Sequence, residues 1–150
     1  MSRHIAFLAA ALVTVACSGA DNTSTSKDAA SGAPSAPAQS TVGGPFTPDP
    51  GGKVITVELA SDGTGNYFKP AEIHAKPGDV VRYTLKVGVH NVHFLPDSNA
   101  GRTGYPQAAS DFLQLPGQTY DVLVHLAPGT YYFQCDPHAA LGMKGHLIVE

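Results

Sequence analysis

The stretch that decides both the fold and the chemistry of this chain is YYFQCDPHAALGMKGHLIVE, residues 131–150. Within it, Cys135, His138 and Met143 are spaced as Cys-x2-His-x4-Met. A thiolate, an imidazole and a thioether form a soft ligand set, and soft sulfur ligands select copper, above all Cu(I). Two histidines and one cysteine in a trigonal arrangement, with a distant axial methionine, are typical of copper sites that transfer electrons.

A second histidine ligand must come from elsewhere in the chain, and the candidate is His90 in the stretch GVHNV, 45 residues before Cys135. A ligand from a distant strand would tie the ligand loop to the domain and form the site in advance. Such a site suits a metal that changes oxidation state with little rearrangement. Pro137 stiffens the loop, and Gly142 allows the backbone to turn before Met143.

The other histidines fit a metal site less well. His93 lies three residues after His90, and residues three apart in an extended strand point to opposite faces, so His93 is the weaker candidate. Three further histidines lie on expected strands without metal spacing and are predicted to be surface or packing residues: His74, His125 and His146.

Cys135 has a second explanation, as a buried free cysteine that behaves as a small hydrophobic residue. An unpaired cysteine in an oxidising compartment usually pairs or reacts. The other cysteine, Cys17, lies in such a different context that a disulfide is not expected. Coordination keeps a thiol deprotonated, and the nearby His138 and Met143 favour a metal.

The composition limits the function classes. A chain of 150 residues predicts one domain plus tails. Nine basic and twelve acidic side chains give a formal net charge of -3, without a basic block, so nucleic-acid binding is not expected. Six Tyr, six Phe, no Trp and frequent Gly and Pro fit a turn-rich β protein.

The N-terminal residues 1–17 are predicted to be a lipoprotein-type signal peptide. Arg3 precedes an apolar run, 5–16, that is too short for a transmembrane helix. The run ends at Cys17 in a pattern that resembles the bacterial lipobox, in which this cysteine is acylated. Thr14 departs from the Leu usual in that pattern. The alternatives are an ordinary signal peptide cut nearby or a buried N-terminal helix.

Residues 18–52 are rich in Ser, Ala, Thr, Gly and Pro, with Val42 and Phe46 as the only large apolar residues. Such a segment cannot bury enough apolar surface to offset its ordering entropy, so a disordered linker is expected. The linker would let a folded domain, 53–150, move away from a membrane towards a partner.

The pattern of 53–150 predicts an all-β fold. Short strands are expected at 54–59, around Ile73, and at 80–87, 92–95, 120–126, 131–135 and 145–149. Turns are expected at 61–66, 76–79 and 127–130, and a short helix or single turn at 107–113 within the irregular stretch 96–118. Inward residues are expected to be Val81, Tyr83, Leu85 and Val87 in one strand, and Tyr131, Phe133 and Cys135 in another. Seven to eight strands of this kind predict a Greek-key β-sandwich.

Two stretches together, GVHNVHF and YYFQCDPHAALGMKG, resemble the plastocyanin family of cupredoxins, and CxPHxxxGMKG is similar to bacterial and halocyanin-like members. The resemblance covers roughly 53–150 and includes YFKPAEIHAKPGDVV. It implies a cupredoxin-like fold with one type 1 (blue) copper ion. It also implies equatorial ligands His90, Cys135 and His138, the axial ligand Met143, and Asn91 as a brace between the ligand loops. The acidic docking patches of plant plastocyanins are not evident. The redox partner of this chain therefore cannot be inferred from the photosynthetic members of the family.

The sequence thus predicts a monomeric electron carrier, tethered to a bacterial membrane in the periplasm or elsewhere outside the cytoplasm. Redox donor and acceptor proteins are expected to dock near His138, among Pro137, Ala139, Ala140 and Leu141, unless these residues simply fill the loop. The alternative function is an extracytoplasmic copper carrier or buffer. An enzyme is not expected, because four protein ligands leave no open position for a substrate. Structural zinc is chemically feasible, but methionine argues against it.

Overall fold

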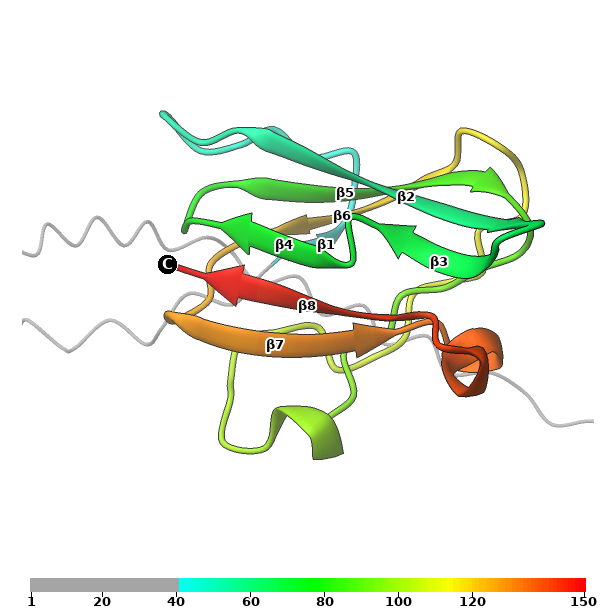
Figure 1. The fold of residues 1–150 in the computed structure, drawn as a ribbon. Coiled ribbons are helices and arrows are strands. Elements are labelled where there is room, and N and C mark those ends of the chain that lie inside the picture. The colour runs from blue at the N-terminus through cyan, green and yellow to red at the C-terminus, as the bar shows by residue number, and fades with distance from the viewer. Residues whose placement is uncertain (1–40) are drawn as a thin grey trace, which may run out of the picture. The chain divides into compact units, whose positions relative to one another are not determined.

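Two β-sheets face each other in the part of the chain that the computed structural model describes, residues 41–150 (Figure 1). The larger sheet has the order β1 (Thr41–Gly43), β6 (Thr119–Leu123), β5 (Val80–Val87), β2 (Val54–Asp62) and β3 (Gly65–Lys69). The smaller sheet has the order β4 (Glu72–Ala75), β8 (Lys144–Val149) and β7 (Gly129–Gln134). The pairs β2–β5 and β4–β8 are parallel, and the other pairs are antiparallel. The predicted all-β sandwich is confirmed.

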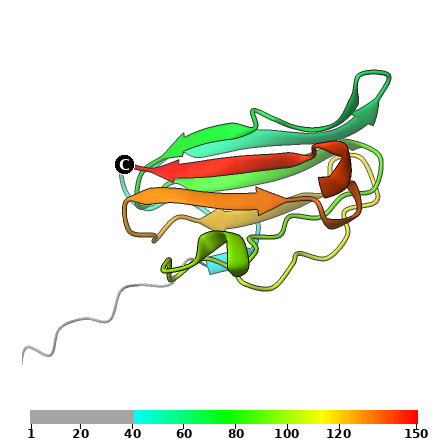
Figure 2. The same ribbon diagram turned by 60° about the horizontal axis from the view of Figure 1, so that its bottom comes forward.

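Alternation of buried and exposed side chains along the strands builds the core between the two sheets. Figure 2 shows the two sheets from a second direction. Val81, Tyr83 and Leu85 of β5 are fully buried, as predicted. The ring of Phe133 packs edge-to-face against Phe68 and Tyr83, with centroids 4.9 and 5.4 Å away. Aromatic pairs in this geometry stabilise a core beyond their buried area.

Val87 was predicted to point inward, and this was wrong. Its exposed fraction is 46 %, because β5 ends there and the chain turns at Gly88. Exposure of this last residue leaves an apolar side chain at the end of the sandwich where the loops gather.

Other predicted boundaries also differ from the structure. The expected loop 61–66 is shorter, because β2 continues to Asp62 and β3 begins at Gly65. The stretch 92–95 is not a strand: it has only the isolated bridge of His93 to Gln134. No helix forms at 107–113; the 3₁₀ helix η1 (Asp97–Asn99) lies earlier.

The predicted linker 18–52 overlaps residues that belong to the folded unit. β1 pairs with β6, and the backbone N–H of Phe46 donates to Asp121, 2.8 Å away. Hydrogen bonds to the sheet therefore order residues that composition alone marked as linker. The predicted signal peptide 1–17, the acylation of Cys17 and the linker part 18–40 lie outside the described residues.

Among the described residues, the structure contains no helix that is both long and apolar enough to cross a membrane.

Candidate metal centre

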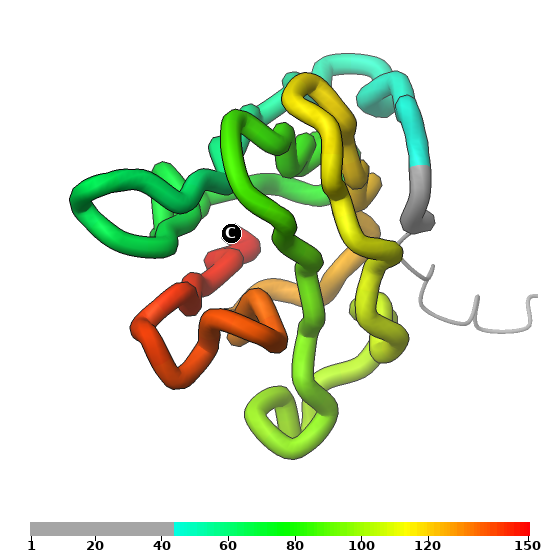
Figure 3. The backbone as a smooth tube through the Cα atoms, turned by 90° about the vertical axis from the view of Figure 1, so that its right-hand side faces the viewer, coloured from blue at the N-terminus to red at the C-terminus, as the bar shows by residue number. Residues whose placement is uncertain are grey.

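The predicted ligand loop lies at one end of the sandwich, between β7 and β8, and Figure 3 looks onto this end. It forms the 3₁₀ helix η2 (Asp136–Leu141), which Gly142 ends with a left-handed φ of 95°. The N–H of Met143 then donates to His138 O, and the N–H of Cys135 donates to Met143 O, both at 3.1 Å. These bonds close the loop on itself, so its side chains have fixed directions.

Three ligand atoms from two distant parts of the chain converge at this end. Cys135 Sγ lies 3.5 Å from His90 Nδ1 and 3.4 Å from His138 Nδ1, and the two nitrogens are 3.2 Å apart. A point equidistant from atoms so spaced is about 2 Å from each, close to the metal–imidazole distance of about 2.0–2.1 Å known for zinc. Among residues 41–150, this is the only trio of His, Cys, Asp or Glu side chains that converges in this way.

Cys135 and His90 are both fully buried, and Cys135 is a free cysteine. Burial raises the pKa of the Cys135 thiol, while hydrogen bonds from the backbone of Asn91 and His138 act in the opposite direction. A metal ion would replace the thiol proton and remove the conflict between burial and charge. The donor set therefore fits a thiolate-binding ion such as copper.

The second ring nitrogen of His90 is held by groups that fix its tautomer. Nε2 lies 3.2 Å from Val87 O, which can only accept, and 3.1 Å from Ser61 Oγ. Ser61 Oγ in turn lies 2.5 Å from Asn66 Oδ1, to which it donates. The proton of a neutral His90 ring is therefore on Nε2, and Nδ1 presents its lone pair to the metal. Burial, then the charge of His138, lowers the pKa of His90 and favours this neutral form.

Gly88 is a site residue that the sequence reasoning did not identify. Its φ is +99°, and a Cβ there would lie 2.8 Å from His90 Nε2 and 2.9 Å from Ser61 Oγ. A glycine two residues before a candidate histidine was the only signal for it. Ser61, which had been placed in a loop, also gave no sign of contacting the ligand.

Asn91 braces the two ligand-bearing segments, as the family resemblance implied. Its Oδ1 accepts from the Asp136 N–H, and its Nδ2 donates to Asp136 Oδ2, both at 2.8 Å. The brace thus contacts the residue that follows Cys135 directly.

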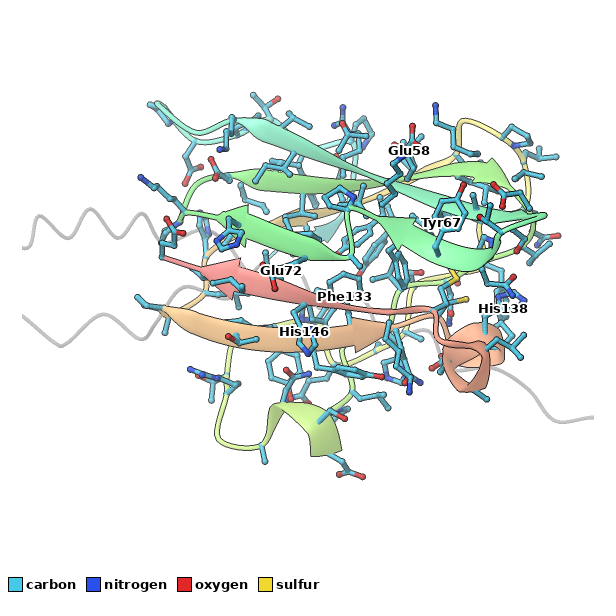
Figure 4. All side chains as sticks on the ribbon, viewed as in Figure 1. Glu58, Tyr67, Glu72, Phe133, His138 and His146 are labelled. Atoms are coloured by element: carbon cyan, nitrogen blue, oxygen red, sulfur yellow. The ribbon has the colours of Figure 1, made fainter. Side chains whose placement is uncertain are left out.

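His138 and Met143 complete the predicted set at different depths. His138 is partly exposed at the end of the molecule (Figure 4), whereas Met143 is fully buried. Leu141 beside them is 67 % exposed. The loop therefore presents one candidate ligand to solvent together with the exposed apolar residues Pro137, Ala140 and Leu141.

The remaining histidines lie apart from this trio. His93 Nδ1 bonds to Asp136 Oδ1 at 2.9 Å. His74 and His146 are exposed, and His125 bonds to Asp49. His93 is therefore a neighbour of the ligand loop and is not among the converging ligand atoms.

Comparisons with known proteins agree with this geometry. Residues 55–150 match the sequence model of a family described as copper-binding proteins, plastocyanin/azurin family. The chain is 33% identical to a plastocyanin of Scenedesmus fuscus over 98 residues, 64% of this chain and 99% of that protein. It is 35% identical to plastocyanin A/B of Petroselinum crispum over 96 residues, 63% of this chain and 98% of that protein.

Solved structures give the same result. A mutant fern plastocyanin superimposes with a TM-score of 0.52 at 33% identity, covering 64% of this chain and all of that one (100%). An oxidised amicyanin variant gives a TM-score of 0.52 at 27% identity, covering 75% of this chain and 99% of that one.

Proposed function

The chain belongs to the plastocyanin/azurin family of copper-binding proteins, and on this basis we propose that it transfers single electrons through one copper ion held by His90, Cys135, His138 and Met143. The observation that carries this proposal is the convergence of two Nδ1 atoms and one Sγ atom within 3.2–3.5 Å of one another. Bound copper supplies the redox chemistry by alternating between Cu(I) and Cu(II).

The protein's own part is to keep the ligands in place when the charge of the ion changes. Val87 O and Ser61 hold the His90 ring, the Asn91–Asp136 bonds hold the backbone around Cys135, and Met143 is fully buried. A site that is formed in advance needs little rearrangement between the two oxidation states, and this favours fast electron exchange over catalysis.

Electrons enter and leave through the partly exposed His138, and partners dock on the apolar side chains around it. Leu141, Val89 and Leu115 are 67, 47 and 66 % exposed. Leu141 ends η2, Val89 directly precedes His90, and Leu115 follows Leu113, whose backbone bonds to that of His90, by two residues. Small, weakly charged contacts are typical of short-lived redox complexes. The variant Leu141→Asp should slow electron exchange while the visible spectrum stays unchanged. Val54→Asp, at the start of β2, is the matched control.

The cellular placement is part of the same proposal. Acylated Cys17 holds the monomeric protein at a bacterial membrane, with the copper domain outside the cytoplasm. Replacing Cys17 with Ala should release the protein from the membrane fraction, and mass spectrometry should find acyl chains on the wild-type residue. A membrane-bound Cys17→Ala variant, or an unmodified Cys17, would contradict the anchor.

A copper carrier is the second candidate, because a partly exposed ligand such as His138 can pass its ion to an acceptor. Stopped-flow measurements separate the two functions. Rapid exchange of electrons with a small redox protein, without loss of copper, supports electron transfer. Rapid loss of copper to an acceptor, with slow electron exchange, would favour the carrier.

A further inference from the structure

The carboxylate of Asp136 is the meeting point of three side chains from both ligand-bearing segments. It accepts from Asn91 Nδ2 at 2.8 Å, from His93 Nδ1 at 2.9 Å and from Gln134 Nε2 at 3.0 Å. The side chain is 37 % exposed and follows Cys135 directly. Three donors on one carboxylate favour its ionised form, which can only accept.

Each of these donors is held in its orientation by another contact. The Asp136 N–H donates to Asn91 Oδ1, so the amide of Asn91 must turn Nδ2 towards the carboxylate. The hydroxyl of Tyr132 donates to Gln134 Oε1 at 2.9 Å, which turns Gln134 Nε2 the same way. The backbones of His93 and Gln134 exchange two hydrogen bonds of 2.9 Å.

These contacts hold a negative charge on the ligand loop itself, one residue after Cys135 and two residues before His138.

We propose that Asp136 is a positioning residue whose fixed charge, held by Asn91, His93 and Gln134, lowers the reduction potential of the copper site. A negative charge stabilises Cu(II) more than Cu(I), because Cu(II) has one more positive charge. The same hydrogen bonds lock the loop of Cys135 onto the segment of His90, as outer hydrogen bonds do around other metal sites. This inference rests on the proposed function and identifies what tunes the site.

The test is to compare Asp136→Asn, which removes the charge at nearly constant shape, with Asp97→Asn, the same change on the exposed helix η1. Measured in the full chain by redox titration at pH 8, Asp136→Asn should raise the reduction potential and Asp97→Asn should not. The preference of the Asp136→Asn variant for Cu(II) over Cu(I) should be several-fold lower than that of the wild type. Equal potentials in the two variants, with Cu–thiolate absorption retained, would overturn the proposal.

A second readout needs no copper. In the metal-free wild type, the side-chain amide protons of Asn91 should exchange slowly with solvent, and in Asp136→Asn they should exchange faster. Fast exchange in the wild type would overturn the positioning role, even if the chain bound no copper and the proposed function itself failed. If Asp136→Asn does not fold, Asp136→Ser removes the same charge with a smaller polar side chain and provides the same comparison.

Discussion

Two clusters of polar side chains in this molecule, one around Asp121 and one around Cys135, differ in whether the protein itself supplies all their hydrogen-bond partners. Asp121, with a fully buried side chain, accepts three bonds from Arg82, the shortest 2.7 Å long to Oδ2, and one from the Phe46 N–H at 2.8 Å. The ligand atoms of Cys135, His90 and His138 instead face one another at 3.2–3.5 Å. The first group is completed by the protein itself, whereas the second provides ligands for a metal ion.

The difference shows how structural and functional polarity can be told apart inside one core. A structural group finds donors and acceptors in matching numbers, and its removal destabilises the fold. In a metal site the lone pairs of several ligand atoms point to one place. The other ring nitrogen of a histidine ligand is held by the protein, as Ser61 and Val87 O hold His90 Nε2. The following predictions test this distinction.

The largest effect on stability is expected at Asp121 and Arg82, whose hydrogen-bond partners all come from the protein. Asp121→Ala leaves Arg82 and the Phe46 N–H without their acceptor and should lower the free energy of unfolding by about 3–5 kcal/mol. Urea unfolding of the metal-free protein measures this loss, and Asp97→Ala is the exposed control. A loss below about 1 kcal/mol would place this pair with ordinary surface ion pairs.

Copper should stabilise the cluster of Cys135, His90 and His138 and leave the cluster around Asp121 unchanged. At a free copper concentration 100 times the Kd, binding should raise the free energy of unfolding by about 2.7 kcal/mol. Hydrogen exchange should slow at the amides of Asn91 and His138 more than at Phe46. Equal slowing at all three amides would show that the metal end is not distinct in this sense.

Gly88→Ala tests how closely the chain must approach His90. A left-handed φ costs a non-glycine residue roughly 1–2 kcal/mol, and the new Cβ would press on His90 Nε2 and Ser61 Oγ. We expect a stability loss of this size together with weaker copper binding, measured by competition with a chelator. Gly63→Ala, where no atom lies within 4 Å, should change neither quantity. Unchanged copper affinity in Gly88→Ala would argue against the approach.

Tyr83 has a buried hydroxyl group without a hydrogen-bond partner among the described residues. The Tyr131 hydroxyl, by contrast, donates to Ala127 O at 2.8 Å. Tyr83→Phe should therefore leave stability unchanged or raise it by up to about 1 kcal/mol, while Tyr131→Phe should lower it by about 0.5–1.5 kcal/mol. Thermal unfolding measures both, and the reverse order would refute this explanation.

The smallest effect is expected on the exposed face of the smaller sheet. Hydrogen bonds that the His74 ring donates to the carboxylates of Glu150 and then Glu72 raise the pKa of His74. A histidine whose pKa is raised on folding stabilises the protein below its unfolded pKa of about 6.5, and this contribution disappears as pH rises through the folded value. His74→Gln should thus reduce stability slightly at pH 5.5 and not at pH 8.5. His146→Gln serves as the control, and equal effects at both pH values would contradict the shift.

Much of this could be predicted from the sequence, because strand alternation and ligand spacing are local signals. The inward face of Tyr131, Phe133 and Cys135 follows from the two-residue period of a strand. The spacing of Cys135, His138 and Met143 identified the metal loop.

What could not be predicted depends on contacts between residues distant in the chain. Asp136 and His93 meet only after folding, across 43 residues. The same is true of Phe46 and Asp121, which is why residues 41–52 were expected in a linker. The stretch 92–95 has strand-like residues, but in the structure only an isolated bridge joins it to β7. Composition and periodicity contain no information about such pairings.

The most direct test of the central claim is the visible spectrum of the full chain after adding Cu(II), then ascorbate, then an oxidant. We expect an intense thiolate-to-copper absorption that bleaches on reduction, returns on oxidation and is absent from Cys135→Ser. Only weak absorption, or oxidation of Cys135 without a reversible band, would contradict a copper–thiolate electron-transfer site.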